Sequence, residues 1–166
     1  MITIPAHDAS DDEWYEYGQK SCELLKPHLA DFLTDRFSYK PRYVKQMLWR
    51  SGSTISAFTR KYDLYFRAFG RPQDFWPREC IILARLMFKE QRVGHGRDLV
   101  ETFVKLAPEF GYQFLAIECA NKNAAAFGKR MGFTPHEDGR HWVGSISDIQ
   151  QALGASHRES LVSRER

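Results

Sequence analysis

The spacing of apolar residues near the amino terminus predicts helices. Over residues 14–29 the apolar positions recur with roughly helical spacing, and Asp11 or Asp12 stands where a helix cap is expected. Pro27 is expected to divide this stretch, because proline removes a backbone donor from a helix interior. A second helix is predicted over residues 41–49, which begin with a proline at a position that helices tolerate.

Strand patterns dominate the middle of the chain and return near its end. Residues 54–59 are short and rich in β-formers, and residues 62–69 alternate between apolar and polar positions. Residues 80–88 form a nearly continuous apolar run, which is typical of an interior strand covered on both faces. Residues 114–119 predict a second buried strand and residues 141–146 a final one.

The order of these elements predicts one α/β domain over residues 1–155, with a helical part at 1–50 and a flexible tail at 156–166. No apolar run approaches the roughly 20 residues of a membrane span, and residues 1–8 lack the pattern of a secretory signal. The three cysteines show no metal-ligand spacing, so we expect no metal site and a reducing, cytoplasmic setting.

Charge is segregated along the chain. Residues 1–35 carry eight acidic and two basic side chains, whereas residues 36–92 carry thirteen basic and four acidic ones. The same middle region holds twelve of the twenty-three aromatic residues. Interleaved basic and aromatic residues can follow a phosphate backbone and stack on bases, but the aromatics can equally form the core, with basic side chains covering its rim.

A glycine-rich turn, residues 91–96, joins the strongest strand to a predicted helix that stops near Pro108. Backbone N–H groups at the start of a helix favour an anion, and Gly94 and Gly96 let a phosphate approach the main chain. Arg92 and Arg97 can add charge-assisted hydrogen bonds. The turn is not a P-loop, because no GK[ST] follows, and it lacks the third glycine of a dinucleotide-binding fingerprint.

This turn resembles the [RQ]xxGx[GA] motif that binds pyrophosphate in the GNAT superfamily of N-acyltransferases. Residues 121–133 resemble a second GNAT pattern, NxxAxxxYxxxGF, with Asn121, Ala124, Gly132 and Phe133 in register. The resemblance covers roughly residues 79–134 and implies a GNAT-like α/β fold, with a mixed, mostly antiparallel central sheet and helices on both faces. The six residues 81–86 are also similar to the corresponding strand of toxin-type GNATs, which acetylate aminoacyl-tRNA.

The resemblance also implies an acyl-CoA site, with acetyl-CoA as co-substrate. Backbone groups of the interior strand would pair with the pantetheine arm, the turn would hold the pyrophosphate, and the segment from Asn121 would face the cofactor. The implied cofactor-binding residues are Leu86, Met87, Phe88, Gln91, Arg92, Val93, Gly94, His95, Gly96, Arg97, Asn121, Ala124 and Phe127.

Two features depart from the GNAT pattern. The loop before Gln91 is about two residues shorter than is usual in the family, and Gly128 stands where a tyrosine commonly protonates the departing thiolate. Either another group or solvent supplies the proton, or the space beside Gly128 holds a bulky acceptor, or the protein binds acyl-CoA without turnover. The candidate acids are Tyr112, Cys119, His136 and His141, and the candidate bases are Glu79 and Glu118.

The leading functional hypothesis is acetyl transfer from acetyl-CoA to a primary amine. The basic middle region favours an anionic acceptor, such as RNA or a nucleotide, and a homodimer is compatible with this hypothesis. Two alternatives stay open at this point. One is a GNAT-like protein that binds nucleic acid or modifies a base, and the other is an interaction protein that binds acyl-CoA without catalysis.

Overall fold

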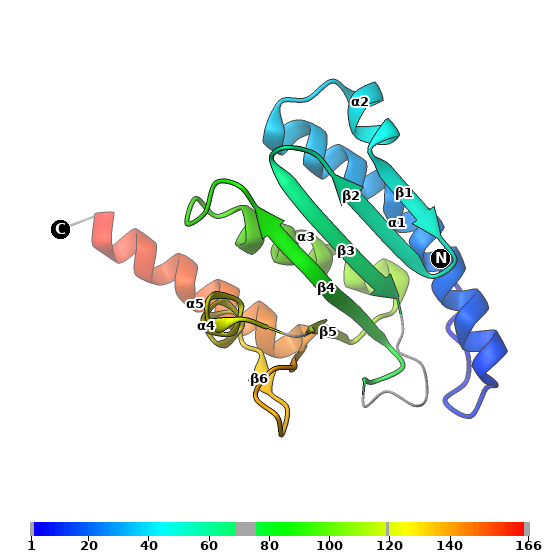
Figure 1. Cartoon of the computed structure of the whole chain (residues 1–166). Coiled ribbons are helices and arrows are strands. Elements are labelled where there is room, and N and C mark those ends of the chain that lie inside the picture. The colour runs from blue at the N-terminus through cyan, green and yellow to red at the C-terminus, as the bar shows by residue number, and fades with distance from the viewer. Residues whose placement is uncertain (1, 69–75, 119, 165–166) are drawn as a thin grey trace.

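The computed structural model describes residues 2–68, 76–118 and 120–164. The chain folds into helices and strands, and the helices pack around one sheet (Figure 1). In chain order they are α1 (Asp11–Phe37), α2 (Pro41–Gln46), β1 (Leu48–Ser51), β2 (Thr54–Phe58), β3 (Tyr62–Ala68), β4 (Cys80–Phe88), α3 (His95–Phe110), β5 (Phe114–Ile117), α4 (Lys122–Arg130), β6 (Thr134–Pro135), β7 (Trp142–Ser145) and α5 (Ile146–Arg164).

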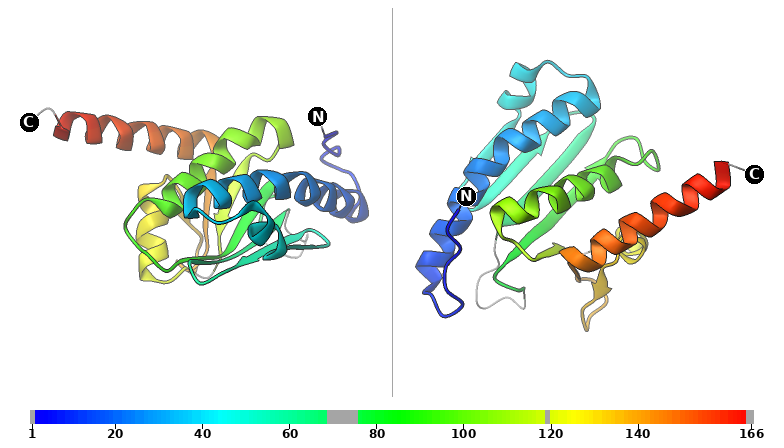
Figure 2. Two further views of the ribbon diagram at one scale, coloured as in Figure 1. Left: turned by 90° about the horizontal axis from the view of Figure 1, so that it is seen from above. Right: turned by 180° about the vertical axis from the view of Figure 1, so that it is seen from behind.

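In the described part of the chain, seven strands form a single sheet in the order β1-β2-β3-β4-β5-β7-β6. Every neighbouring pair is antiparallel except β4 and β5, which are parallel and joined through α3. Helices α1, α3 and α5 lie on one side of the sheet, and α4 lies in front of α5 in the view of Figure 1 (Figures 1 and 2). The predicted fold class, a GNAT-like α/β fold with a mixed and mostly antiparallel sheet, is confirmed.

Helix α1 differs from the prediction at its start and in its middle. Ser10 is the cap, because its hydroxyl accepts from the Glu13 N–H while the Glu13 carboxylate accepts from the Ser10 N–H. The helix also runs through Pro27 without a break. Pro27 is exposed, and the buried Leu25 and Leu29 on either side hold both halves against the core, so packing outweighs the lost hydrogen bond.

The predicted second helix is too long. Helix α2 ends at Gln46, and Leu48–Ser51 forms the edge strand β1, which pairs with β2 from Leu48↔Ala57 to Ser51↔Thr54. Strand pairing is a tertiary interaction, and it overrides the helical pattern of Leu48 and Trp49.

The carboxyl-terminal region also differs from the prediction. Residues 156–164, expected to be part of a flexible tail, continue helix α5 to Arg164, so the predicted boundary at residue 155 falls inside a helix. Ile149 and Leu153 anchor the first half of α5 in the core. The second half is largely exposed and projects beyond the other helices (Figure 2, left).

Apolar side chains of the sheet pack in two groups. The larger group joins α1, α3 and α5 to one face of the strands, with Leu64, Leu83 and Leu115 among its members. On the other face of β4 and β5, Trp76 packs with Cys80, Ile82 and Ala116. Residues 80–83 of β4 are therefore covered on both faces, whereas residues 84–88 are partly or fully exposed, so the predicted interior strand over 80–88 is covered on both faces only in its first half.

Candidate active site

The cleft arises where β4 and β5 separate. Among the described residues these strands pair from Cys80↔Phe114 to Leu83↔Ile117, whereas β4 continues to Phe88 paired with β3 alone. The Lys89 N–H donates to the Lys61 carbonyl next to β3. Because backbone groups alternate in direction along a strand, Leu86 and Phe88 present their N–H and C=O groups to the open edge.

This open edge forms one wall of a cleft of about 1120 Å³. Its other walls come from the glycine-rich turn, the first residues of α3, the end of β5, one side of α4, and α5. Thirteen residues were predicted to bind the cofactor, and all of them except Val93 line this cleft. The cleft lies at the carboxyl ends of two parallel strands, where open α/β sheets commonly bind ligands.

Two residues of the glycine-rich turn have left-handed backbone conformations. Gly94 caps α3 with a φ of 89°, a left-handed conformation that favours glycine, and Arg92 has a φ of 61°. The amides of His95, Gly96 and Arg97 are in the first turn of α3, where a helix offers them no acceptor of its own. These residues line the cleft, so the turn presents donors to an anion.

Gly96 allows a close approach between the turn and α4. A Cβ atom at this position would lie 3.4 Å from the ring of Phe127 and 4.0 Å from the Leu86 side chain. The two glycines of the motif therefore differ in their roles. Gly94 is needed for the backbone conformation, whereas a Cβ at Gly96 would only contact Phe127 and Leu86 at the boundary between α3 and α4.

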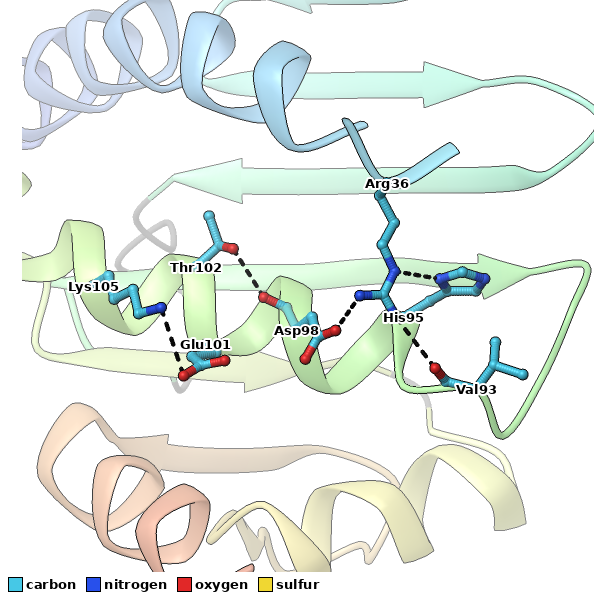
Figure 3. A network of polar contacts seen from close by, with 7 residues as sticks. All are labelled: Arg36, Val93, His95, Asp98, Glu101, Thr102 and Lys105. Carbon is cyan, nitrogen blue, oxygen red and sulfur yellow. Dashed lines mark hydrogen bonds and ion pairs between the residues drawn. The ribbon is translucent and has the colours of Figure 1, made fainter. Parts of the chain in front are cut away.

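Arg36, which sequence reasoning missed, ties the end of α1 to this turn (Figure 3). Its Nε donates to His95 Nδ1 at 2.8 Å, one Nη donates to the Val93 carbonyl at 3.2 Å, and the other pairs with the Asp98 carboxylate. A lone arginine in the last turn of a helix carries no sequence signal for such a contact, because the two segments meet only in the folded chain.

The ring of His95 serves packing and hydrogen bonding. It lies 4.7 Å from the ring of Phe37 and 5.3 Å from that of Phe88, measured between centroids. Burial, and then the charge of Arg36, lower the pKa of His95. Its Nδ1 accepts the hydrogen bond from Arg36, which requires the unprotonated nitrogen. The backbone amide of His95 therefore faces the cleft, while its side chain packs against Phe37 and Phe88 and accepts from Arg36.

Of the predicted catalytic residues, Glu118 lies in the cleft. It directly follows β5, and its N–H donates to the Leu83 carbonyl at 3.3 Å. Among the described residues this bond is the last between the two chain segments, so Glu118 stands at the point where β4 and β5 separate. Arg67 of β3 donates to it at 2.7 Å, which holds the side chain in place.

Glu79 and Tyr112 lie at the opposite end of the strands. The Glu79 carbonyl accepts from the Gln113 and Phe114 N–H groups beside the start of β5. Tyr112 is fully buried, its hydroxyl donates to the Phe103 carbonyl, and burial raises its pKa. Neither residue lines the cleft, so their predicted catalytic roles lack a geometric basis.

Of the other candidate acids, neither histidine supplies a donor to the cleft. His136 and His141 lie on the segment that joins β6 and β7, and neither is among the lining residues. Cys119 lies outside the described residues. Within residues 2–68, 76–118 and 120–164, the lining includes no tyrosine and no cysteine.

Gly128 leaves no open space. A Cβ atom there would lie 3.1 Å from Cδ1 of Ile117, 3.6 Å from Phe133 and 3.8 Å from Trp142. The glycine lets α4 pack closely on β5 and β7, and the aliphatic and aromatic side chains around it fill the region. The hypothesis that this position accommodates a bulky acceptor is therefore wrong.

Asn121 starts α4 beside the cleft. Its Oδ1 accepts from the Ala124 N–H at 2.9 Å, and this bond caps the helix. Ala124 and Phe127 follow at helical spacing and line the cleft, so one face of α4 is directed towards it.

No group of three metal-ligating side chains occurs in the part of the chain that the structure describes. The described cysteines, Cys22 and Cys80, are buried thiols, and burial raises the pKa of Cys22 to about 12. None of the described helices is long and apolar enough to span a bilayer.

Several solved structures are similar to this one at low sequence identity. An acetyltransferase of the GNAT family from Staphylococcus aureus is 12% identical with a TM-score of 0.45, and the alignment covers 86% of this chain and 97% of that one. The structure of the AtaT–AtaR complex bound to DNA is 20% identical with a TM-score of 0.44, and the alignment covers 91% of this chain and 97% of that one. Tetrahymena GCN5 is 14% identical with a TM-score of 0.40, and the alignment covers 75% of this chain and 88% of that one. No family model and no curated protein matches the sequence. By its own strand order, glycine-rich turn and Asn121 cap, the chain has a GNAT-like fold.

Proposed function

We propose that this protein belongs to the GNAT superfamily and is an acyl-CoA-dependent N-acyltransferase. The supporting observation is one continuous cleft, which joins the open edge of β4 to the free amides at the start of α3. An extended pantetheine arm can pair with Leu86 and Phe88 as an added strand. The pyrophosphate then meets the amides of the turn, and Arg92 and Arg97 are close enough to line the same region.

This orientation directs the thioester towards the point where β4 and β5 separate. The amine nitrogen of the acceptor attacks the thioester carbonyl carbon, the C–S bond breaks, and the nitrogen loses a proton. Glu118 is the carboxylate at this point, so we assign the proton from the amine to it, directly or through a water. A thiolate is a good leaving group near neutral pH, and we propose that solvent protonates it.

The acceptor that fits this cleft best is a primary amine on an anionic molecule. Four of the thirteen basic residues between positions 36 and 92 are neutralised by ion pairs in the described structure. Much of the positive charge of this region is therefore available to an anion.

A protein that binds acyl-CoA without turnover is the second candidate. It is favoured by Gly128, which replaces the usual tyrosine of the family pattern with a residue that cannot donate a proton. Kinetics decide between the two candidates. Release of free thiol from acetyl-CoA that depends on an added amine supports the enzyme, whereas binding without release supports the second candidate.

Calorimetry with acetyl-CoA tests the cofactor site. Gly96→Glu places a carboxylate beside the amides of the turn without requiring a left-handed backbone, so we expect binding to be lost. Gly154→Glu is the matched control, because this glycine is exposed on α5 with no atom near its Cβ position. Equal affinity in the wild type and Gly96→Glu would overturn the assignment of the pyrophosphate site.

A further inference from the structure

One face of the sheet carries aromatic side chains that no described element covers. The pairing register aligns Trp49, Ser56, Tyr65 and Arg85 across β1 to β4. Directly paired residues share a face, so these four side chains form one row. Their neighbours along the strands, such as Leu64, are buried against α1 on the opposite face. Figure 1 views the sheet from the uncovered side, with α1 and α3 behind it.

The exposure of this face is unusual for large apolar residues. Trp49 is 49% exposed, Phe58 53% and Met87 61%, and Phe58 and Met87 both pair with Asp63 in a second row. A contiguous patch of exposed apolar side chains on a protein surface commonly marks a binding site. We call this surface the open face, defined by Trp49, Phe58, Tyr65, Arg85 and Met87.

A basic rim borders the open face at the end nearest the glycine-rich turn. Arg60 lies in the turn between β2 and β3, and Lys89 follows β4 directly beside it, as the bond from the Lys89 N–H to the Lys61 carbonyl shows. Lys45 is near the end of α2, two residues before Met47, whose carbonyl accepts from the Phe58 N–H. Among the described residues, Arg60, Lys89 and Lys45 are exposed and form no ion pair.

We propose that the open face and its basic rim bind a single-stranded nucleic acid. Aromatic side chains on a sheet can stack with bases, and cations at its border can contact phosphates. A duplex keeps its bases stacked on one another, so free aromatic rings favour a single strand. Three strand spacings separate Trp49 from Arg85, about 14 Å, which is wide enough for two or three nucleotides.

The open face is continuous with the proposed active site. Arg85 and Met87 belong to the open face and also line the cleft, and Arg67 of β3 bonds to Glu118 where β4 and β5 separate. A strand bound across the face can therefore extend into the acceptor side of the cleft. This inference rests on the proposed function, since it identifies the acceptor as an amine carried by a nucleic acid strand.

Fluorescence anisotropy with a labelled 12-nucleotide RNA tests the proposal in the absence of acetyl-CoA. We expect the wild type to bind at about 50 mM salt and to weaken steeply at about 200 mM. Trp49→Ala and Tyr65→Ala should each weaken binding about 5- to 100-fold, because each removes a stacking platform. Tyr15→Ala is the matched control, since Tyr15 is 52% exposed on α1.

Charge reversal tests the rim separately. The double variant Arg60→Glu/Lys89→Glu should weaken RNA binding at least about tenfold and reduce its dependence on salt. Lys105→Glu, on an exposed part of α3, should change little. A single-stranded DNA 12-mer that binds with an affinity similar to that of the RNA supports contacts to bases and phosphates. Binding to duplex only, no binding at about 50 mM salt, or equal affinity in the wild type and Trp49→Ala would overturn the proposal.

The two proposals can fail separately. If calorimetry finds no acetyl-CoA binding while the RNA binds and Trp49→Ala weakens it, the open face stands as a binding surface and the enzymatic function fails. If acetyl-CoA binds and the RNA does not, the open face is overturned and the cofactor site stands.

Discussion

The two ends of the β4–β5 pair differ sharply although the same two strands build both. At the amino end the strands are paired, and the buried Tyr112 closes the junction with α3. At the carboxyl end pairing stops after Leu83, and the edge from Ala84 to Phe88 is open. The comparison shows that length decides the position of the cleft, because β5 has four residues and β4 has nine.

The largest expected effect is on stability and comes from the closed end. Phe103 is buried against Phe66, and its carbonyl accepts the Tyr112 hydroxyl. Phe103→Ala should lower the free energy of unfolding by about 3–5 kcal/mol, measured by denaturant titration, because it leaves a cavity. Acetyl-CoA affinity of the folded protein should change little. A decrease in the free energy of unfolding of less than about 1 kcal/mol would show that the packing around Phe103 does not stabilise the closed end of the β4–β5 pair.

The next effect is on catalysis and contrasts the two ends directly. Glu118→Gln should lower kcat/KM about 100-fold or more with acetyl-CoA affinity unchanged, because the base is lost and the side-chain shape is kept. Glu79→Gln is the matched variant at the closed end and should retain activity. Equal activities for the two variants would refute the assignment of the base.

A smaller effect is expected behind the glycine-rich turn. Arg36→Ala removes the contacts to His95, Asp98 and the Val93 carbonyl, so the turn becomes less ordered. We expect acetyl-CoA affinity to fall about 5- to 10-fold by calorimetry. Arg78→Ala breaks an ion pair with Asp11 outside the cleft and should leave affinity unchanged. Unaltered binding in Arg36→Ala would mean that the turn is ordered without α1.

The smallest effect is a pH dependence of stability. Because folding lowers the pKa of His95, its neutral form is favoured in the folded state. The contribution of His95 to the free energy of unfolding is fully present above the pKa of the unfolded state, about 6.5. It is lost as the pH falls through the lower pKa of the folded state. Melting temperatures at about pH 7.5 and 5.5 should therefore differ more in the wild type than in His95→Gln. A larger difference in melting temperature in His95→Gln than in the wild type would contradict the lowered pKa of His95.

Several elements could be predicted because their signals are local. The interior strand is a continuous apolar run, and the turn at Gly94 has a positive φ that glycine favours. Asn121 caps α4 through a hydrogen bond to a residue three positions away. The prediction of the cleft lining followed from these elements and from the GNAT resemblance together.

Other elements could not be predicted because their causes lie far away in the sequence. Strand β1 exists because it pairs with β2, and Pro27 stays inside α1 because buried leucines on both sides hold the helix. Glu79, at the start of one predicted strand, and Glu118, near the end of the next, were both candidate bases. Only the end of the β4–β5 pairing after Leu83 shows that the cleft opens at the end that carries Glu118.

The sequence by itself determined the local conformations: the strand, the glycine-rich turn, the start of α3 and the cap of α4. Each depends on backbone sterics or on hydrogen bonds within a few residues. The tertiary structure decided where the strands separate, which carboxylate meets the cleft, and how Arg36 supports the turn. It also showed that Gly128 serves close packing between α4, β5 and β7. These features depend on contacts between distant segments, which form only when the whole chain has folded.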